Sequence, residues 1–169
     1  TVEIAVRQTP IVPSGPVVPG LSTGADLIAF VKAVNSGAST SRWQNEAGEV
    51  VLLNDIDLTG MTEWTPIGSG TAKGTPAYDL VSPFSGVFNG QGFAIKGIQW
   101  VYNVTDATTH LYGLFGAIKD ATIKNLVLGA EGDQITVVGS NANVIAVGAL
   151  VGHAESSTIM GVSNNVSVV

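Results

Sequence analysis

The stretch FSGVFNGQGFAIKGI, from Phe84 to Ile98, places four glycines among large apolar residues. Such a stretch either holds a phosphate group or forms the turns of a repeating β fold. A dinucleotide-binding fingerprint needs Gly-x-Gly-x-x-Gly at the start of a helix, whereas Gly90 and Gly92 lead into the strand-like run Phe93–Ile95. Because the third glycine and the helix are missing, we interpret these glycines as the turns of a β fold.

Related segments recur further along the chain. The tetrapeptide IKGI (Ile95–Ile98) aligns with IKNL (Ile123–Leu126) and with IMGV (Ile159–Val162). The steps are 28 residues (123 − 95) and 36 residues (159 − 123), which indicates a constant unit with loops of variable length. Repeats of this size are typical of stacked architectures, in which each unit contacts its neighbours.

The third residue of each tetrapeptide indicates how the units are built. Gly97, Asn125 and Gly161 are residue types that enter the left-handed backbone conformation at low cost. A bend there lets apolar residues on both sides face one interior, which simple strand alternation forbids. The pattern therefore predicts a β-solenoid. The residues predicted to stack as one interior ladder, with their side chains in contact, are Ile95, Ile123 and Ile159.

One amphipathic helix is predicted ahead of the repeats. Thr23 and Asp26 have the spacing of a capping box, with Asp in place of the usual Glu or Gln. Apolar residues then recur at helical spacing as far as Val34, and Asn35 and Gly37 supply a stop signal. A helix with one apolar face must lie on an apolar surface of the rest of the chain.

Two parts of the chain are distinguished. Residues 1–6 (TVEIAV) alternate like an edge strand, and residues 8–20 hold four of the seven prolines, which disfavour helix and central strand. We predict an N-terminal strand and Pro-rich linker over residues 1–20. The capping helix and the β domain follow over residues 21–169.

Composition excludes several classes of function. The net charge is −6, and the seven basic residues do not cluster, which argues against nucleic acid and anionic membrane surfaces as partners. The absence of cysteine excludes disulfides, a thiolate nucleophile and a Cys-type zinc site. No apolar run reaches the roughly 18 residues of a transmembrane helix. Export from the cell stays open on this evidence.

An ordered series of motifs resembles one known family. The capped helix is followed by LLNDIDLTG, WTPIG, FSGVFNGQGFAIKGI, and LYGLFG with IKNLVL. This succession, over about residues 21–169, resembles bacterial cell-surface proteins with GLUG-type repeats, which are adhesin-like. The resemblance implies a right-handed parallel β-helix with a helix capping its N-terminal end, and an extracellular or cell-surface location. It carries no established catalytic residues, and no cofactor is expected.

Aromatic residues give the binding hypothesis. Trp100 and Tyr102 share a strand face, and His110 lies in the polar segment that ends at residue 112. Flat aromatic rings suit stacking on sugar rings or peptides, so Trp100, Tyr102 and His110 are the predicted ligand-binding residues, and the predicted partner is an extracellular glycan or protein. The alternative is that Trp100 and Tyr102 point inward as core, as large aromatic residues usually do.

An enzyme is the alternative function, because some parallel β-helices cleave acidic polysaccharides. Inverting hydrolysis needs two carboxylates about 6.5–9.5 Å apart. Asp55 and Asp57 are the densest acidic group, but a solvated turn also explains them. His110 and His153 lack a partner at metal-ligand spacing. No catalytic or metal-binding residues are therefore predicted. Variable loops at residues 68–80 and 99–112 are the expected places for any ligand.

Self-association is predicted at the ends. The segment NNVSVV at residues 164–169 is β-prone and uncharged, and no helix follows it to protect a strand edge. Such an edge could be completed by a stacked copy or by the TVEIAV strand of another molecule. The other interpretation is that the chain is a piece of a longer β-helix.

Overall fold

The computed structural model describes residues 17–72, 78–106, 108–139 and 144–169, and the chain in these ranges is mainly β. No helix in these ranges is long and apolar enough to cross a membrane. The helices are α1 (Gly24–Ser36) and the 3₁₀ turn η1 (Ser41–Trp43). The strands are β1 (Val50–Val51), β2 (Ile56–Asp57), β3 (Ser69–Ala72), β4 (Tyr78–Ser82), β5 (Phe84–Asn89), β6 (Ala94–Lys96), β7 (Gln99–Val104), β8 (Thr109–Tyr112), β9 (Phe115–Leu128), β10 (Gln134–Gly139), β11 (Val144–Val147), β12 (Val151–Glu155), β13 (Thr158–Asn164) and β14 (Ser167–Val168). The strand predicted at residues 1–6 and most of the proline-rich linker lie outside the described residues.

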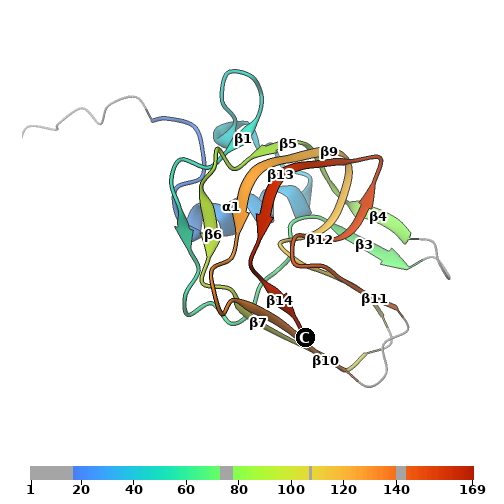
Figure 1. Ribbon diagram of the computed structural model, residues 1–169. Coiled ribbons are helices and arrows are strands. Elements are labelled where there is room, and N and C mark those ends of the chain that lie inside the picture. Colours follow the sequence, from blue (N-terminus) through green and yellow to red (C-terminus); the bar gives the residue numbers. More distant parts are fainter. Residues whose placement is uncertain (1–16, 73–77, 107, 140–143) are drawn as a thin grey trace, which may run out of the picture.

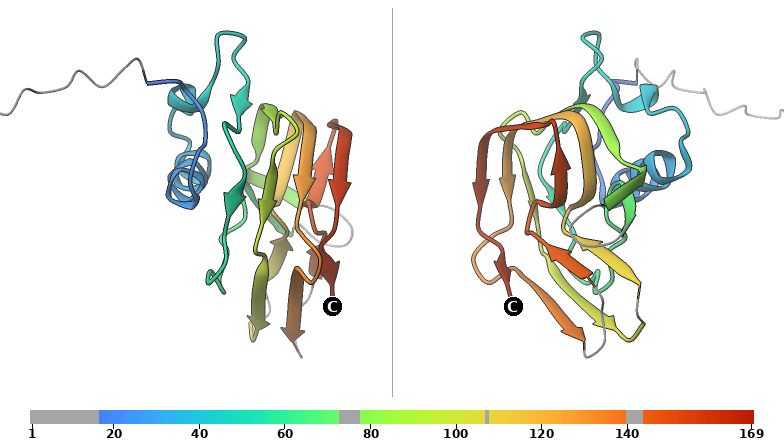
Figure 2. Two further views of the ribbon diagram at one scale, coloured as in Figure 1. Left: turned by 60° about the vertical axis from the view of Figure 1, so that its left-hand side comes forward. Right: turned by 90° about the vertical axis from the view of Figure 1, so that its right-hand side faces the viewer.

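Helix α1 forms where the sequence predicts it. The Thr23 hydroxyl accepts a hydrogen bond from the Asp26 backbone N–H, and the Asp26 carboxylate accepts one from the Thr23 N–H, so the capping box is complete. Gly37 ends the helix with a left-handed φ of 70°. The apolar face is buried, and its members are Leu27, Phe30, Val31 and Val34. Figure 2 shows α1 lying at one end of the stacked strands.

The long strand β9 organises a curled, parallel sheet. β5 pairs with one side of β9, and β12 and β13 pair with the other side, all in parallel register (Figure 1). β6 continues from β5 along β9, and β1 and β2 pair with β5 and β6. Separate parallel ladders join β14, β10 and β7, and join β11 and β8. Among the described strands, β3 and β4 form the antiparallel pair.

The sheet curls because β9 bends at two residues with positive φ. Asp120 has φ 50° and Asn125 has φ 52°. Each bend is matched in the next layer, because the register places Ser156 (φ 48°) beside Asp120 and Gly161 (φ 60°) beside Asn125. Gly97 also has a positive φ, of 76°. The predicted left-handed conformation of Gly97, Asn125 and Gly161 is therefore confirmed.

The predicted isoleucine ladder is wrong at one of its three positions. Ile123 pairs with Ile159 as expected, but its partner on the other side is Phe88, whereas Ile95 pairs with Leu128. The steps of this ladder are 35 residues (123 − 88) and 36 residues (159 − 123), so the 28-residue step is incorrect. The alignment failed because bends at different corners of the curl use the same kinds of residue.

The segment at residues 99–112 is also corrected, because most of it is strand and not loop. β7 pairs with β10 over its whole length, and β8 pairs with β11. Burial alternates along β7, where Trp100, Tyr102 and Val104 are buried. Part of the other predicted loop, residues 68–80, is the β3–β4 hairpin, and residues 73–77 lie outside the described residues.

The core is a continuous apolar interior that starts under α1. The Phe30 ring contacts Phe84 and Phe88 at centroid distances of 5.8 and 6.1 Å, and Phe88 contacts Phe115 at 5.4 Å. Trp43 meets Phe30 edge-on at a centroid distance of 5.4 Å, so it packs beside the helix. Aromatic pairs of this kind add to the free energy of burial. The helix is thus anchored to the strands through their interior.

Candidate functional site

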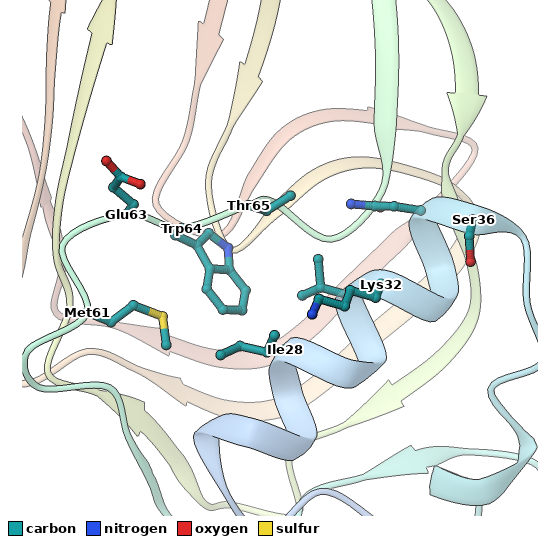
Figure 3. A pocket seen from close by; sticks show the side chains of 9 residues that line it. Ile28, Lys32, Ser36, Met61, Glu63, Trp64 and Thr65 are labelled. Atoms are coloured by element: carbon teal, nitrogen blue, oxygen red, sulfur yellow. The ribbon is translucent and has the colours of Figure 1, made fainter.

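A cleft of about 700 Å³ lies between α1 and the segment that precedes β3 (Figure 3). Its lining is Ile28, Val31, Lys32, Asn35, Ser36, Met61, Glu63, Trp64 and Thr65. In Figure 3, Ile28 and Lys32 project from the helix and Met61 and the Trp64 indole project from the opposite wall. Its volume falls within the range of small-molecule sites, about 300–1,000 Å³.

The wall opposite the helix is fixed by hydrogen bonds. The Asn35 side-chain amide donates to the Pro66 carbonyl at 3.0 Å and accepts from the Gly68 N–H at 2.8 Å. The Trp64 indole N–H donates to the Leu114 carbonyl at 3.1 Å. Asn35, which the sequence identifies as a helix stop, therefore joins α1 to this wall. The Asn35 hydrogen bonds fix the position of α1 relative to this wall, and the Trp64 hydrogen bond fixes the wall relative to Leu114. Together they define the width of the cleft.

Two further hollows meet the cleft at Thr65. One, of about 470 Å³, is lined by Glu63, Trp64, Thr65, Val101, Tyr102, Asn103 and Tyr112. The other, of about 200 Å³, is lined by Asn35, Thr65, Pro66, Gly68, Ser69, Gly70, His110, Leu111 and Tyr112. Thr65 lines all three, so the cleft and the two hollows adjoin this residue, and we call them together the Thr65 face.

Stacked aromatic rings line the two smaller hollows of the Thr65 face. Tyr102 and Tyr112 stack at a centroid distance of 3.9 Å, and His110 lies parallel to Tyr112 at 5.3 Å. The Tyr102 hydroxyl donates to the Trp64 carbonyl at 2.9 Å. Burial raises the pKa of both tyrosines above the ordinary value of 10. Tyrosine hydroxyls are neutral at pH 7 even without this shift. The face therefore combines flat rings with neutral polar groups.

Asp106 orients the imidazole at the edge of this stack. An Asp106 carboxylate oxygen lies 2.7 Å from His110 Nε2, and the Thr108 hydroxyl donates to the same oxygen at 2.9 Å. The hydrogen bond with His110 is the main reason that the pKa of Asp106 is below its usual value. The short turn between β7 and β8 is closed by this contact.

The three predicted ligand-binding residues have different surroundings in the structure. Trp100 is fully buried, and its ring stacks on Trp64 at 5.0 Å, so it belongs to the core. Tyr102 is also buried, although it lines one hollow, and His110 lines another. Ligand binding by Tyr102 and His110 stays a prediction. Tyr112 lies between them and was missed, although its position two residues after His110 on a strand places both on one face.

Several other acidic residues serve local structure. The Asp55 carboxylate accepts from the Ala94 N–H, and Asp57 accepts from the Thr59 N–H and hydroxyl. Buried Asp133 accepts from the N–H groups of Gly97 and Ala130. Among the described residues, no three His, Asp or Glu side chains gather as a metal site. Across the described lining of the Thr65 face, Glu63 is the single carboxylate.

Comparison with known proteins gives one distant similarity. The chain is 27% identical over 143 residues to Halomucin from Haloquadratum walsbyi. The match covers 80% of this chain and 1% of Halomucin, so the chain spans about a hundredth of the length of that relative. No protein-family profile matches the chain, and no solved structure matches it.

Proposed function

We propose that this chain is a non-enzymatic, extracellular module for adhesion or for assembly of a surface structure, built as a right-handed parallel β-helix of the GLUG-repeat type. Parallel pairing between segments 35 or 36 residues apart supports the β-helix, because successive turns of a coil meet in that manner. Helix α1 acts as the cap of its N-terminal end. The distant similarity to a protein named as a mucin supports a place outside the cell.

The Thr65 face is the proposed binding surface, and its ligand is an extracellular glycan or peptide. The observation that carries this proposal is the stack of Tyr102, Tyr112 and His110 beside three adjoining hollows. Sugar rings and peptide groups bind flat aromatic surfaces and exchange hydrogen bonds with neutral polar groups. The parallel sheet behind the face holds these rings in position before a ligand arrives, which reduces the entropy lost on binding.

Non-enzymatic binding is favoured over hydrolysis for a chemical reason. Glycoside hydrolases place two carboxylates about 5–9.5 Å apart around the bond that is cleaved. Glu63 has no second carboxylate beside it in the described lining of the Thr65 face, and Asp55 and Asp57 hold turns. A carbohydrate-active enzyme remains the alternative that the experiment below is designed to detect.

A panel of neutral and acidic polysaccharides tests the proposal. The chain is expected to bind at least one polysaccharide in an affinity assay without releasing reducing ends or unsaturated products. Tyr112→Ala should weaken that binding at least tenfold, because it removes the central ring of the stack, while Tyr112→Phe should keep most of it. Circular dichroism checks that both variants keep their β structure. Product release, or binding that Tyr112→Ala leaves unchanged, would contradict the proposal.

A further inference from the structure

The cleft between α1 and the segment that precedes β3, which we call the α1 cleft, offers an apolar surface apart from the tyrosine stack. Ile28 is 36% exposed and Met61 is half-buried, and both line the cleft together with buried Val31 and Trp64. Figure 3 shows Ile28 on the helix and Met61 and the Trp64 ring on the opposite wall. The unbranched thioether of methionine adapts to groups of different shape. An apolar group in the cleft would therefore be covered from both sides.

Two charged side chains of opposite sign border this apolar surface. Lys32 follows Ile28 by one turn of α1, and Glu63 precedes Trp64 in the opposite wall. Within the part of the chain that the structure describes, neither charged group has an ion pair or a hydrogen bond, whereas other lysines are paired with carboxylates. Complementary charges orient a ligand and add specificity. The cleft is thus complementary to a ligand that is apolar at its centre and carries a carboxylate and an ammonium group on either side.

The length of the α1 cleft fits a short stretch of extended polypeptide. Its lining on the helix runs from Ile28 to Ser36, which is about 12 Å at 1.5 Å per residue. An extended chain rises about 3.3 Å per residue, so about five residues cover this length. Residues two apart point to the same side at a spacing of about 7 Å, close to the rise of about 6 Å between Ile28 and Lys32. An apolar residue with charged residues two positions away on each side matches these dimensions.

Other ligand chemistries fit the α1 cleft less well. A sugar ring would place hydroxyl groups against Val31 and Trp64, and the Trp64 indole N–H is already bonded to the Leu114 carbonyl. Hydroxyl groups that lose water without gaining a hydrogen bond raise the free energy of the complex. A lipid chain would cover the apolar surface but would leave both charged groups without partners. These two comparisons favour a polypeptide.

We propose that the α1 cleft binds an extended segment of a partner protein in which a large apolar side chain lies between an acidic and a basic residue. The apolar side chain enters between Ile28, Met61 and Trp64. The acidic residue pairs with Lys32, and the basic residue pairs with Glu63. This inference rests on the proposed role of the Thr65 face as a binding surface and names the class of ligand that its cleft takes. The tyrosine stack in the neighbouring hollows stays available for a glycan.

Methyl NMR of methionine tests the proposal, because Met61 lines the cleft whereas Met160 is exposed on β13. The probes are the peptides Asp-Thr-Leu-Thr-Lys and Lys-Thr-Leu-Thr-Asp, blocked at both ends, which cover the two directions of binding. At least one should shift the Met61 signal to saturation and leave the Met160 signal in place. Replacing the leucine of that peptide by serine should weaken binding at least about tenfold. No Met61 shift with either peptide, or equal binding of the serine peptide, would overturn the proposal.

Variants of the helix test the apolar contact and the charge separately. Ile28→Glu should weaken peptide binding at least about tenfold, and Val81→Glu, at an exposed apolar position of β4, is the matched control that should bind as the native chain does. Lys32→Glu should weaken binding at least about threefold. This variant should in turn bind Lys-Thr-Leu-Thr-Lys better than the native chain does. Circular dichroism checks that each variant is folded. An unchanged charge preference in Lys32→Glu would overturn the placement of the acidic residue.

Peptide binding and polysaccharide binding can fail independently. Tyr112 lines the two smaller hollows and not the α1 cleft, so Tyr112→Ala should weaken polysaccharide binding and leave peptide binding intact. Ile28→Glu should have the opposite effect. A polysaccharide that shifts the Met61 signal where the peptides do not would assign the cleft to a glycan and overturn this inference. A Met61 signal that moves with protein concentration alone would assign the cleft to a second copy and overturn it as well.

Discussion

Single residues at the bends decide where the strands turn. Asp120 and Asn125 of β9 adopt positive φ, and Ser156 and Gly161 do the same in the next layer. Asn, Asp and Gly adopt this conformation at the lowest cost in free energy. Because each bend is stacked on another bend, the apolar residues on both sides stay turned toward the interior. Local backbone preference at a few positions thus sets the shape of the sheet.

Paired isoleucines provide a test of burial at the residue scale. Ile123→Asp should cost about 4 kcal/mol or more, because the new carboxylate would be buried without a partner. Ile159→Asp should cost about 1 kcal/mol or less, since that side chain is half-exposed. Urea unfolding followed by circular dichroism compares the two. Equal losses would contradict the layered arrangement.

Glu49 predicts a dependence of stability on pH. A hydrogen bond from Lys124 is the main reason that the pKa of Glu49 lies below its ordinary value of 4.5, and Asn89 donates a second. A lowered pKa in the folded state means that the ionised carboxylate stabilises the fold above pH 4.5 and that this contribution is lost as pH falls through the folded pKa.

The variant Glu49→Gln should therefore lose about 1 kcal/mol or less at pH 7, because the pair is partly exposed. The difference from the native chain should shrink below pH 4.5 and vanish in stronger acid. Glu46→Gln changes an exposed side chain and serves as the control. Denaturant midpoints at several pH values measure the effect. A difference that grows in acid would show that Glu49 plays another role.

At the scale of elements, β9 is long because its bends do not interrupt pairing. It runs from Phe115 to Leu128, with β5 and β6 on one side and β12 and β13 on the other. Other corners use separate turns, as at Gly97, where the chain passes from β6 to β7. There the Gly97 N–H donates to the buried carboxylate of Asp133, which ties the corner to the next layer.

Two glycines allow backbone strain to be separated from crowding at such corners. Both Gly97 and Gly92 have positive φ, of 76° and 84°. A Cβ on Gly97 would lie 2.5 Å from the Thr59 backbone nitrogen, whereas one on Gly92 would meet no atom within 4 Å. Gly92→Ala should therefore cost about 1 kcal/mol and Gly97→Ala about 3 kcal/mol. Thermal unfolding measures both. Equal costs would mean that the corner adapts to the added methyl group.

At the scale of the whole molecule, the two ends of the stack differ. α1 covers one end through Phe30, and at the other end β12, β13 and β14 each have one strand neighbour among the described residues. Between these ends the apolar interior is continuous, and the Thr65 face lies beside the helix. β9 has paired strands on both of its sides, whereas β12 and β13 have a described strand neighbour on one side. The layer with a neighbour on one side is therefore expected to be the least stable.

Hydrogen exchange of the chain in dilute solution tests this gradient. Amides of β9 should exchange most slowly, because strands lie on both of its sides, and amides of β13 should exchange faster. Mass spectrometry of peptides from the two strands gives both rates. Equal protection in the dilute sample would argue against a layered distribution of stability.

The sequence alone determined the local features of this protein. The capping box, the periodic apolar residues and Gly37 specify α1, because each acts within a few residues along the chain. The left-handed bends at Gly97, Asn125 and Gly161 were equally predictable from residue type. The burial of Trp100 agrees with the alternative interpretation that it points inward as core, although the sequence was also compatible with a ligand-binding role. These features could be predicted because the residues that cause them lie close together in the sequence.

Tertiary structure decided which segments lie side by side. Ile95 follows the turn at Gly92 and Phe88 follows Gly86 within β5, and only the strand pairing shows that Phe88 is the neighbour of Ile123. The Thr65 face likewise joins α1 with residues 61–66 and with β7 and β8, which are far apart in sequence. Local patterns cannot specify these contacts, because the same bend residues serve different corners and the free energy that selects a register comes from burial summed over whole strands.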